Sequence, residues 1–111
     1  AVRDYIHVSD LADIHVKSLE FLLTRKQSQI MNCGYGKGYT VKQVIDHMNK
    51  LCKNRIKIEY APRRNGDPEQ LVSAIEKLNN LIKWTPKYDS LNKILQTALD
   101  WELKLQNEKI L

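Results

Sequence analysis

The sequence has 111 residues, a length that suits one domain or a piece of one. With 42% hydrophobic and 28% charged residues, the composition is that of a globular protein, which excludes a disordered chain and allows one small core. The net charge of +5 fits an anionic ligand, but the basic residues form no stripe interleaved with aromatic side chains and no apolar run approaches membrane length, so neither nucleic acid nor a membrane is an expected partner.

The first two predicted helices carry clear start signals. One is expected from about Ser9 to Thr24, with Ser9 as its N-cap. Its apolar face recurs at helical spacing and comprises Ala12, Val16, Leu19 and Leu23, widened by Leu11, Ile14 and Leu22. Thr40 and Gln43 then form a capping box that opens a second helix, whose apolar stripe runs to Cys52.

Two further helices are predicted in the second half of the chain. Ser73 repeats the capping pattern before a short third helix, and a fourth helix is expected after Ser90. The apolar run from Ile30 to Cys33 and the alternating run from Ile56 to Tyr60 predict strands, and Tyr5 to Val8 is a candidate for a third. The fold class that follows is α/β, with about four helices and a small sheet of short strands.

A glycine loop, Gly34 to Thr40, lies between a predicted strand and a predicted helix, as dinucleotide-binding turns do. Its spacing departs from GxGxxG because Tyr39 stands where the last glycine belongs. A tight turn in which glycines supply positive φ is the more economical interpretation, so no cofactor is assigned to this loop.

A second loop, Pro62 to Pro68, holds Arg63, Arg64 and Asp67. A guanidinium group matches phosphate oxygens as a bidentate donor, and a carboxylate accepts hydrogen bonds from the vicinal hydroxyls of a ribose. These residues could therefore hold the diphosphate and ribose of a nucleotide. An internal salt bridge that pins the turn explains the same pattern, and the spacing does not decide between the two.

Three stretches resemble UDP-glucose 4-epimerases, members of the extended short-chain dehydrogenase/reductase superfamily. They are VRDYIHVSDLADIHVKSLE from Val2, MNCGYGKGYTVKQVI from Met31 and YAPRRNGDPEQ from Tyr60. The similarity extends from Val2 to Trp101. It implies that residues 1–111 are the C-terminal UDP-sugar-binding portion of such an enzyme, detached from its Rossmann domain. The opening AVRDYIHV is accordingly interpreted as the middle of a longer chain.

The resemblance also implies roles for four residues. Arg3 and Arg64 are expected to bind the UDP diphosphate, and Asp67 the uridine ribose. Leu71 is expected beside the hexose, where a bulky side chain restricts N-acetylated sugars and a small one admits them, so leucine leaves their use open. No catalytic residue is expected in this chain, because no Tyr is followed by Lys four residues later. No metal site is expected, because the three histidines lack metal-ligand spacing.

For the parent enzyme, the resemblance implies interconversion of UDP-glucose and UDP-galactose by NAD-mediated oxidation and reduction at C4. NAD is expected on the missing Rossmann domain, and the chain alone is expected to be inactive. The parent is expected to be a homodimer in the cytoplasm, a reducing compartment that suits free thiols at Cys33 and Cys52. Two alternatives remain: a fragment of another nucleotide-sugar reductase, such as a dehydratase or decarboxylase, and a binding domain without catalysis.

Overall fold

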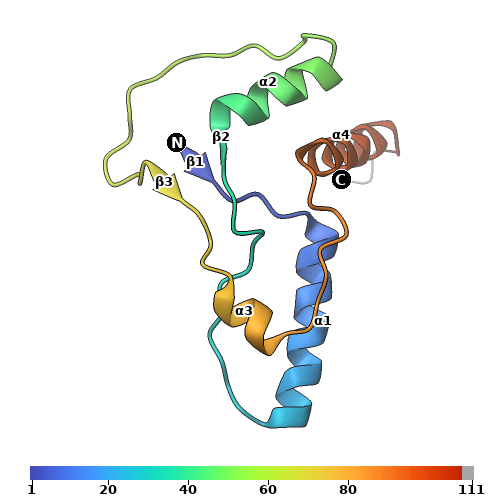
Figure 1. Ribbon diagram of the computed structural model, residues 1–111. Coiled ribbons are helices and arrows are strands. Elements are labelled where there is room, and N and C mark those ends of the chain that lie inside the picture. The colour runs from blue at the N-terminus through green and yellow to red at the C-terminus, as the bar shows by residue number, and fades with distance from the viewer. Residues whose placement is uncertain (109–111) are drawn as a thin grey trace.

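The computed structural model describes residues 1–108, in which four helices and three two-residue strands occur (Figure 1). The helices are α1 (Val8–Arg25), α2 (Val41–Leu51), α3 (Glu76–Leu81) and α4 (Leu91–Glu108). The strands are β1 (Val2–Arg3), β2 (Tyr39–Thr40) and β3 (Gln70–Leu71). The predicted α/β class, with four helices and a small sheet, is therefore confirmed, and α4 follows Ser90 as expected.

β1 is the central strand of the sheet. It pairs antiparallel with β2 and parallel with β3, so Val2 lies opposite both Thr40 and Gln70. The backbone N–H of Val2 also donates to the carbonyl of Glu69 (2.8 Å). The sheet therefore joins the first residues of the chain to two segments that are far away in the sequence. One of these two segments carries the double-arginine loop.

The predicted strand positions are wrong. Residues Ile30 to Cys33 and Ile56 to Tyr60 lie in connecting segments. Of the candidate strand Tyr5 to Val8, the first three residues precede α1 and Val8 is the first residue of that helix. Figure 1 shows the segment between α2 and β3 passing around the outside of the molecule. A strand forms only where a neighbouring segment offers free backbone donors and acceptors in register, and an apolar or alternating run does not supply that neighbour.

The N-cap of α1 lies two residues before the predicted one. It is His7, whose Nδ1 accepts a hydrogen bond from the N–H of Ser9 (3.0 Å). Ser9 therefore lies inside the helix, and its prediction as the cap is wrong. At the other end, Lys26 adopts φ 55° and donates its N–H to the carbonyl of Leu22 (2.9 Å), which closes the last turn.

Of the two N-caps predicted further along the chain, one is confirmed and the other is wrong. The capping box of α2 is confirmed, because Thr40 Oγ1 accepts from the N–H of Gln43 (3.0 Å) and Gln43 Oε1 accepts from the N–H of Thr40 (2.8 Å). The N-cap of α3 is Ile75, without a side-chain hydrogen bond. The prediction of Ser73 as a cap is wrong, because its hydroxyl donates instead to the carbonyl of Cys33 (3.2 Å).

The core lies between α1 and α3, which run beside each other in Figure 1. Its buried members are Ile14, Leu78 and Ile82. Partly buried apolar side chains from both neighbouring loops and helices pack around them. These are Ile6, Phe21, Met31, Cys33, Leu81 and Trp84. The core is therefore small and lies at one end of the molecule, away from the sheet.

Most of the predicted apolar face of α1 lies on the surface. Four side chains at helical spacing are exposed, and we call them the α1 stripe: Ala12, Val16, Leu19 and Leu23. The side of α1 that is buried within residues 1–108 carries Asp10 and Ile14. The helical period is correct, and Ile14 from the edge of the predicted face packs in the core with α3, but the centre of that face is exposed.

Candidate functional site

Arg3 is fixed by the sheet. It belongs to β1, and its guanidinium donates through Nη1 to the carbonyl of Val2 (2.7 Å) and through Nη2 to Oδ1 of Asp67 (2.9 Å). Its side chain is 25% exposed. A partly buried guanidinium with two hydrogen bonds keeps one orientation and remains charged at any working pH.

The double-arginine loop folds around Asp67. Arg64 Nη2 donates to Oδ2 of Asp67 (3.0 Å), and Arg63 Nη2 donates to the backbone carbonyl of Asp67 (3.1 Å). Gly66 adopts φ 78°, which a residue with a side chain rarely does. Arg3, Arg64 and Asp67 therefore meet in space, as the sequence prediction requires. In this structure, their contacts are the internal salt bridges of the alternative interpretation.

The electrostatics of the cluster follow from its charges. The hydrogen bond from Arg64 lowers the pKa of the Asp67 carboxyl and burial opposes it, while the positive charges of Arg64 and Arg3 lower it further. The pKa of Asp67 therefore lies below its ordinary value, and the carboxylate is ionised at neutral pH. The three side chains carry one net positive charge, which suits an incoming anion.

A cavity of about 420 Å³ adjoins this cluster. Its walls combine one face of α2 with the segment that leads into the double-arginine loop. The apolar part comes from Val41, Ile45, Ile58, Tyr60 and Pro62, and the polar rim includes Arg63, Arg64 and Asp67. An apolar cavity of this size with convergent charged groups at its rim is typical of a small-molecule site. The sequence prediction named the charged rim but missed the apolar wall, which only the return of the loop towards α2 creates.

Leu71 occupies a neighbouring strand. It lies in β3 opposite Arg3 in the parallel pairing, and its side chain is exposed. It is not among the residues that line the cavity beside the double-arginine loop. Leu71 and Arg3 are therefore neighbours in the sheet because their strands pair.

The glycine loop does not fit a dinucleotide. The backbone N–H groups of Tyr35 and Gly36 donate to the carboxylate of Asp4 (3.1 and 2.9 Å). A Cβ on Gly34 would lie 2.5 Å from Oδ2 of Asp4, so the glycine admits this carboxylate. In a dinucleotide turn, such N–H groups bind phosphate. Here a carboxylate of the chain itself is their partner, and the structural interpretation of the glycines is favoured.

The sequence did not reveal a buried polar cluster at the start of α1. Asp10 accepts hydrogen bonds from the hydroxyl of Tyr35 and the N–H of Tyr88, and His7 Nε2 lies 2.8 Å from Thr97 Oγ1. Because His7 Nδ1 accepts from Ser9, Nε2 must carry the proton and donate to Thr97. These contacts tie α1 to α4 and to the loops between. Their role is structural, since they do not contact the arginine cluster.

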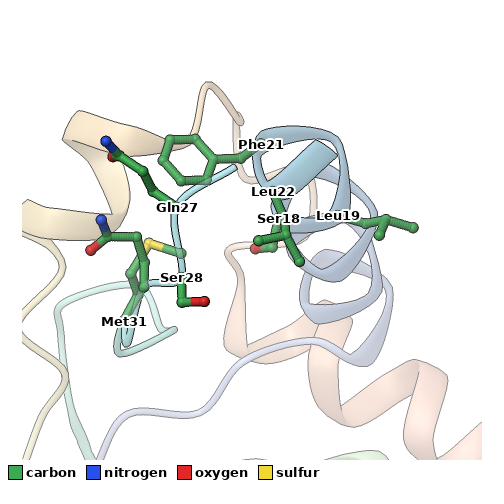
Figure 2. Close-up of a pocket in the computed structure, with 8 residues that line it drawn as sticks. Ser18, Leu19, Phe21, Leu22, Gln27, Ser28 and Met31 are labelled. Atoms are coloured by element: carbon green, nitrogen blue, oxygen red, sulfur yellow. The ribbon is translucent and has the colours of Figure 1, made fainter. Parts of the chain in front are cut away.

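A further pocket, of about 290 Å³, lies between the second half of α1 and the segment that follows it (Figure 2). Its lining consists of apolar and neutral polar side chains, including Leu19, Phe21, Gln27 and Met31. It offers no charge to an anionic ligand. Within residues 1–108, no group of three or more His, Cys, Asp or Glu could hold a metal ion, and none of the helices is long and apolar enough to cross a membrane.

Comparison with known proteins identifies the kind of chain to which this site belongs. No family model matches it. A UDP-glucose 4-epimerase of Azospirillum brasilense is 43% identical over 105 residues, which are 95% of this chain and 30% of that protein. The resemblance to UDP-glucose 4-epimerases is confirmed. The chain spans about a third of the length of these epimerases.

Solved epimerase structures share the fold as well as the sequence. The UDP-Glc/GlcNAc 4-epimerase of Campylobacter jejuni is 44% identical, with a TM-score of 0.82 over 94% of this chain and 31% of that one. A UDP-glucose 4-epimerase of Stenotrophomonas maltophila, solved with NAD and formylated UDP-arabinopyranose, is 29% identical, with a TM-score of 0.88 over 97% of this chain and 32% of that one. The short sheet and the loops around it are therefore similar to one segment of these epimerase structures.

Proposed function

We propose that this chain is the C-terminal, substrate-binding part of a UDP-glucose 4-epimerase that interconverts UDP-glucose and UDP-galactose. The observation that supports it best is the convergence of Arg3 and Arg64 on Asp67 at the rim of an apolar cavity. Arg3, Arg64 and Asp67 together carry one net positive charge and adjoin a cavity, which suits a nucleoside diphosphate. The proposed reaction is inferred from the epimerase relatives, because this chain alone is not expected to carry it out.

Arg3 and Arg64 would bind the diphosphate of UDP, and Asp67 the hydroxyls of the ribose. Charge-assisted hydrogen bonds of this kind contribute about 1.5–3 kcal/mol each. Leu71, on the strand beside Arg3, would lie along the hexose and influence whether N-acetylated sugars are used. Such a site holds the nucleotide firmly and the hexose loosely, which lets the sugar turn over between the two halves of the reaction.

The redox chemistry belongs to another part of the parent enzyme. NAD bound there would supply the hydride chemistry for oxidation and reduction at the sugar C4. The described residues do not fit NAD, because Asp4 occupies the glycine loop, and the sequence has no Tyr-x-x-x-Lys pair. The partner proposed for this chain is therefore the missing Rossmann domain, and the chain alone would be inactive. The exposed α1 stripe is a surface that such a domain could cover.

The parent is further proposed to be a homodimer that acts in galactose metabolism in the cytoplasm. Cys33 and Cys52 are both free thiols, which fits a reducing compartment. The homodimer rests on the family resemblance, and analytical ultracentrifugation of the complete enzyme would test it.

Substitution of Arg64 tests the proposed site. In the complete reading frame, Arg64→Ala removes one of the two guanidinium groups and is expected to weaken UDP binding by about 2 kcal/mol, measured by isothermal titration calorimetry. Arg55→Ala removes the same charge from the same exposed segment, outside the cavity lining, and is the matched control. UDP affinity that is the same in wild type and Arg64→Ala would refute the assignment.

A further inference from the structure

Asp67 makes contacts that ribose binding does not require. Its two carboxylate oxygens accept hydrogen bonds from different arginines: Oδ1 from Arg3 (2.9 Å) and Oδ2 from Arg64 (3.0 Å). Two guanidinium groups so close together repel each other unless an anion lies between them. A single carboxylate thus brings two positive charges to one point in the absence of a ligand.

The two arginines depend on this carboxylate to different degrees. Arg3 is carried by β1 and also donates to the carbonyl of Val2 (2.7 Å). Arg64 lies on an exposed loop, and its side chain is 84% exposed. The ordering of a long exposed side chain carries an entropic cost, and the ion pair with Asp67 is the side-chain contact that offsets this cost for Arg64. Loss of the carboxylate would therefore release Arg64 and leave Arg3 in place.

We propose that Asp67 is a positioning residue for the two diphosphate-binding arginines, an inference that rests on the proposed function. It holds Arg64 beside Arg3 before the nucleotide arrives, so less conformational freedom is lost on binding. A guanidinium fork presents the same donors to a carboxylate and to a phosphate. A diphosphate can therefore replace the carboxylate between the arginines, and Asp67 then becomes available to the ribose hydroxyls.

UDP and UMP differ only in the β-phosphate. The comparison of their affinities therefore separates the positioning of the two arginines from the binding of ribose by Asp67. Titration calorimetry of the 111-residue chain gives Kd values for UDP and UMP, in wild type and in Asp67→Asn. The asparagine keeps one acceptor oxygen and cannot hold both guanidinium groups. We expect the ratio of Kd for UMP to Kd for UDP to fall about tenfold in Asp67→Asn, equivalent to about 1.4 kcal/mol.

Two further variants are controls, one that keeps a carboxylate at position 67 and one that removes a negative charge elsewhere in the chain. Asp67→Glu keeps the carboxylate and is expected to recover most of the UMP-to-UDP ratio. Asp13→Asn removes one negative charge from α1, where Asp13 pairs with Lys17, and is expected to leave the ratio unchanged. An unchanged ratio in Asp67→Asn would overturn the positioning role but leave a UDP site in place. A wild-type chain that binds UDP no better than UMP, or binds neither, would count against the proposed function.

A second measurement needs no nucleotide. NMR relaxation of the arginine Nε–H groups reports whether each guanidinium is ordered on the picosecond-to-nanosecond timescale. Asp67→Asn is expected to make Arg64 mobile, while Arg3 stays ordered through its bond to Val2. Arg64 that is equally ordered in the two proteins, or disordered in wild type, would show that Asp67 does not position it.

Discussion

The carboxylate of Asp10 shows what one buried group does for this fold. It is 1% exposed and accepts hydrogen bonds from the hydroxyl of Tyr35 and from the N–H groups of Lys87 and Tyr88. Burial raises the pKa of the Asp10 carboxyl, but the three hydrogen bonds together outweigh it, so that the pKa lies below its ordinary value. The folded chain therefore favours the ionised form more than the unfolded chain does.

We expect Asp10→Asn to lower the free energy of unfolding at neutral pH by about 3 kcal/mol, because buried donors lose their charged acceptor. In wild type, this stabilisation is complete above the unfolded pKa of Asp10 and is lost as the pH falls through the lower folded pKa. Urea denaturation at several pH values between about 6 and about 3 measures both effects. The exposed carboxylate of Asp100, which accepts from Gln96, provides the control Asp100→Asn. Equal pH dependence in wild type and Asp10→Asn would contradict this account.

The sequence shows two arginines and a carboxylate in one loop, while the roles expected for Arg3, Arg64 and Asp67 came from the family resemblance. A guanidinium and a carboxylate in one loop fit either an anion site or an internal salt bridge, and the structure joins Arg3 and Arg64 to Asp67 by salt bridges. His7 and Tyr35 could not be predicted in the same way. Their hydrogen bonds join residues that are distant in sequence, and no local pattern distinguishes a buried histidine from an exposed one.

Among the elements, α2 is the one whose start depends most on local chemistry. Both halves of its capping box, between Thr40 and Gln43, are formed. We expect Thr40→Ala to lower the free energy of unfolding by about 1 kcal/mol, because the Gln43 N–H loses its acceptor. Thr40→Ser keeps the hydroxyl and is the matched control. Chemical denaturation of the three proteins measures the difference, and equal stability of Thr40→Ala and wild type would show that the cap contributes nothing.

The strands are the elements that the sequence predicted worst. Each has two residues, too short for alternation to be visible, and each exists because a distant partner lies beside it. The runs with good strand composition, such as Ile56 to Tyr60, have no such partner within the described residues. Helices differ because their hydrogen bonds are local, so the apolar period of a helix is visible within the segment itself.

At the scale of the whole molecule, the exposed α1 stripe predicts association. Leu19 and Leu23 are 56% and 69% exposed, and apolar surface of this kind favours contact with a second copy of the chain. We expect the 111-residue chain to self-associate reversibly at high concentration in sedimentation velocity. The double variant Leu19→Glu with Leu23→Lys should remain monomeric, because it replaces the apolar surface with a favourable ion pair along the helix.

The stability of the double variant shows whether Leu19 and Leu23 lie on the surface or in the core. Its free energy of unfolding is expected to stay within about 0.5 kcal/mol of wild type, because both positions are on the surface. Lys42→Glu with Asp46→Lys reverses an existing ion pair on α2, which gives the same Glu-to-Lys order along a helix, and should leave self-association unchanged because it does not touch the α1 stripe. A wild-type chain that sediments as a clean monomer at high concentration would refute the prediction.

The sequence by itself determined where the four helices lie, the capping box of α2 and which charged side chains the double-arginine loop carries, because each of these is a local property of the chain. Tertiary structure alone decided which strands pair, which side of α1 is buried and where the apolar wall of the cavity lies. These depend on contacts between distant segments, which the hydrophobic effect selects without regard to sequence order. Arg3 and Asp67 belong to both groups, because their charges are evident in the sequence while their meeting depends on β1 and β3 lying side by side.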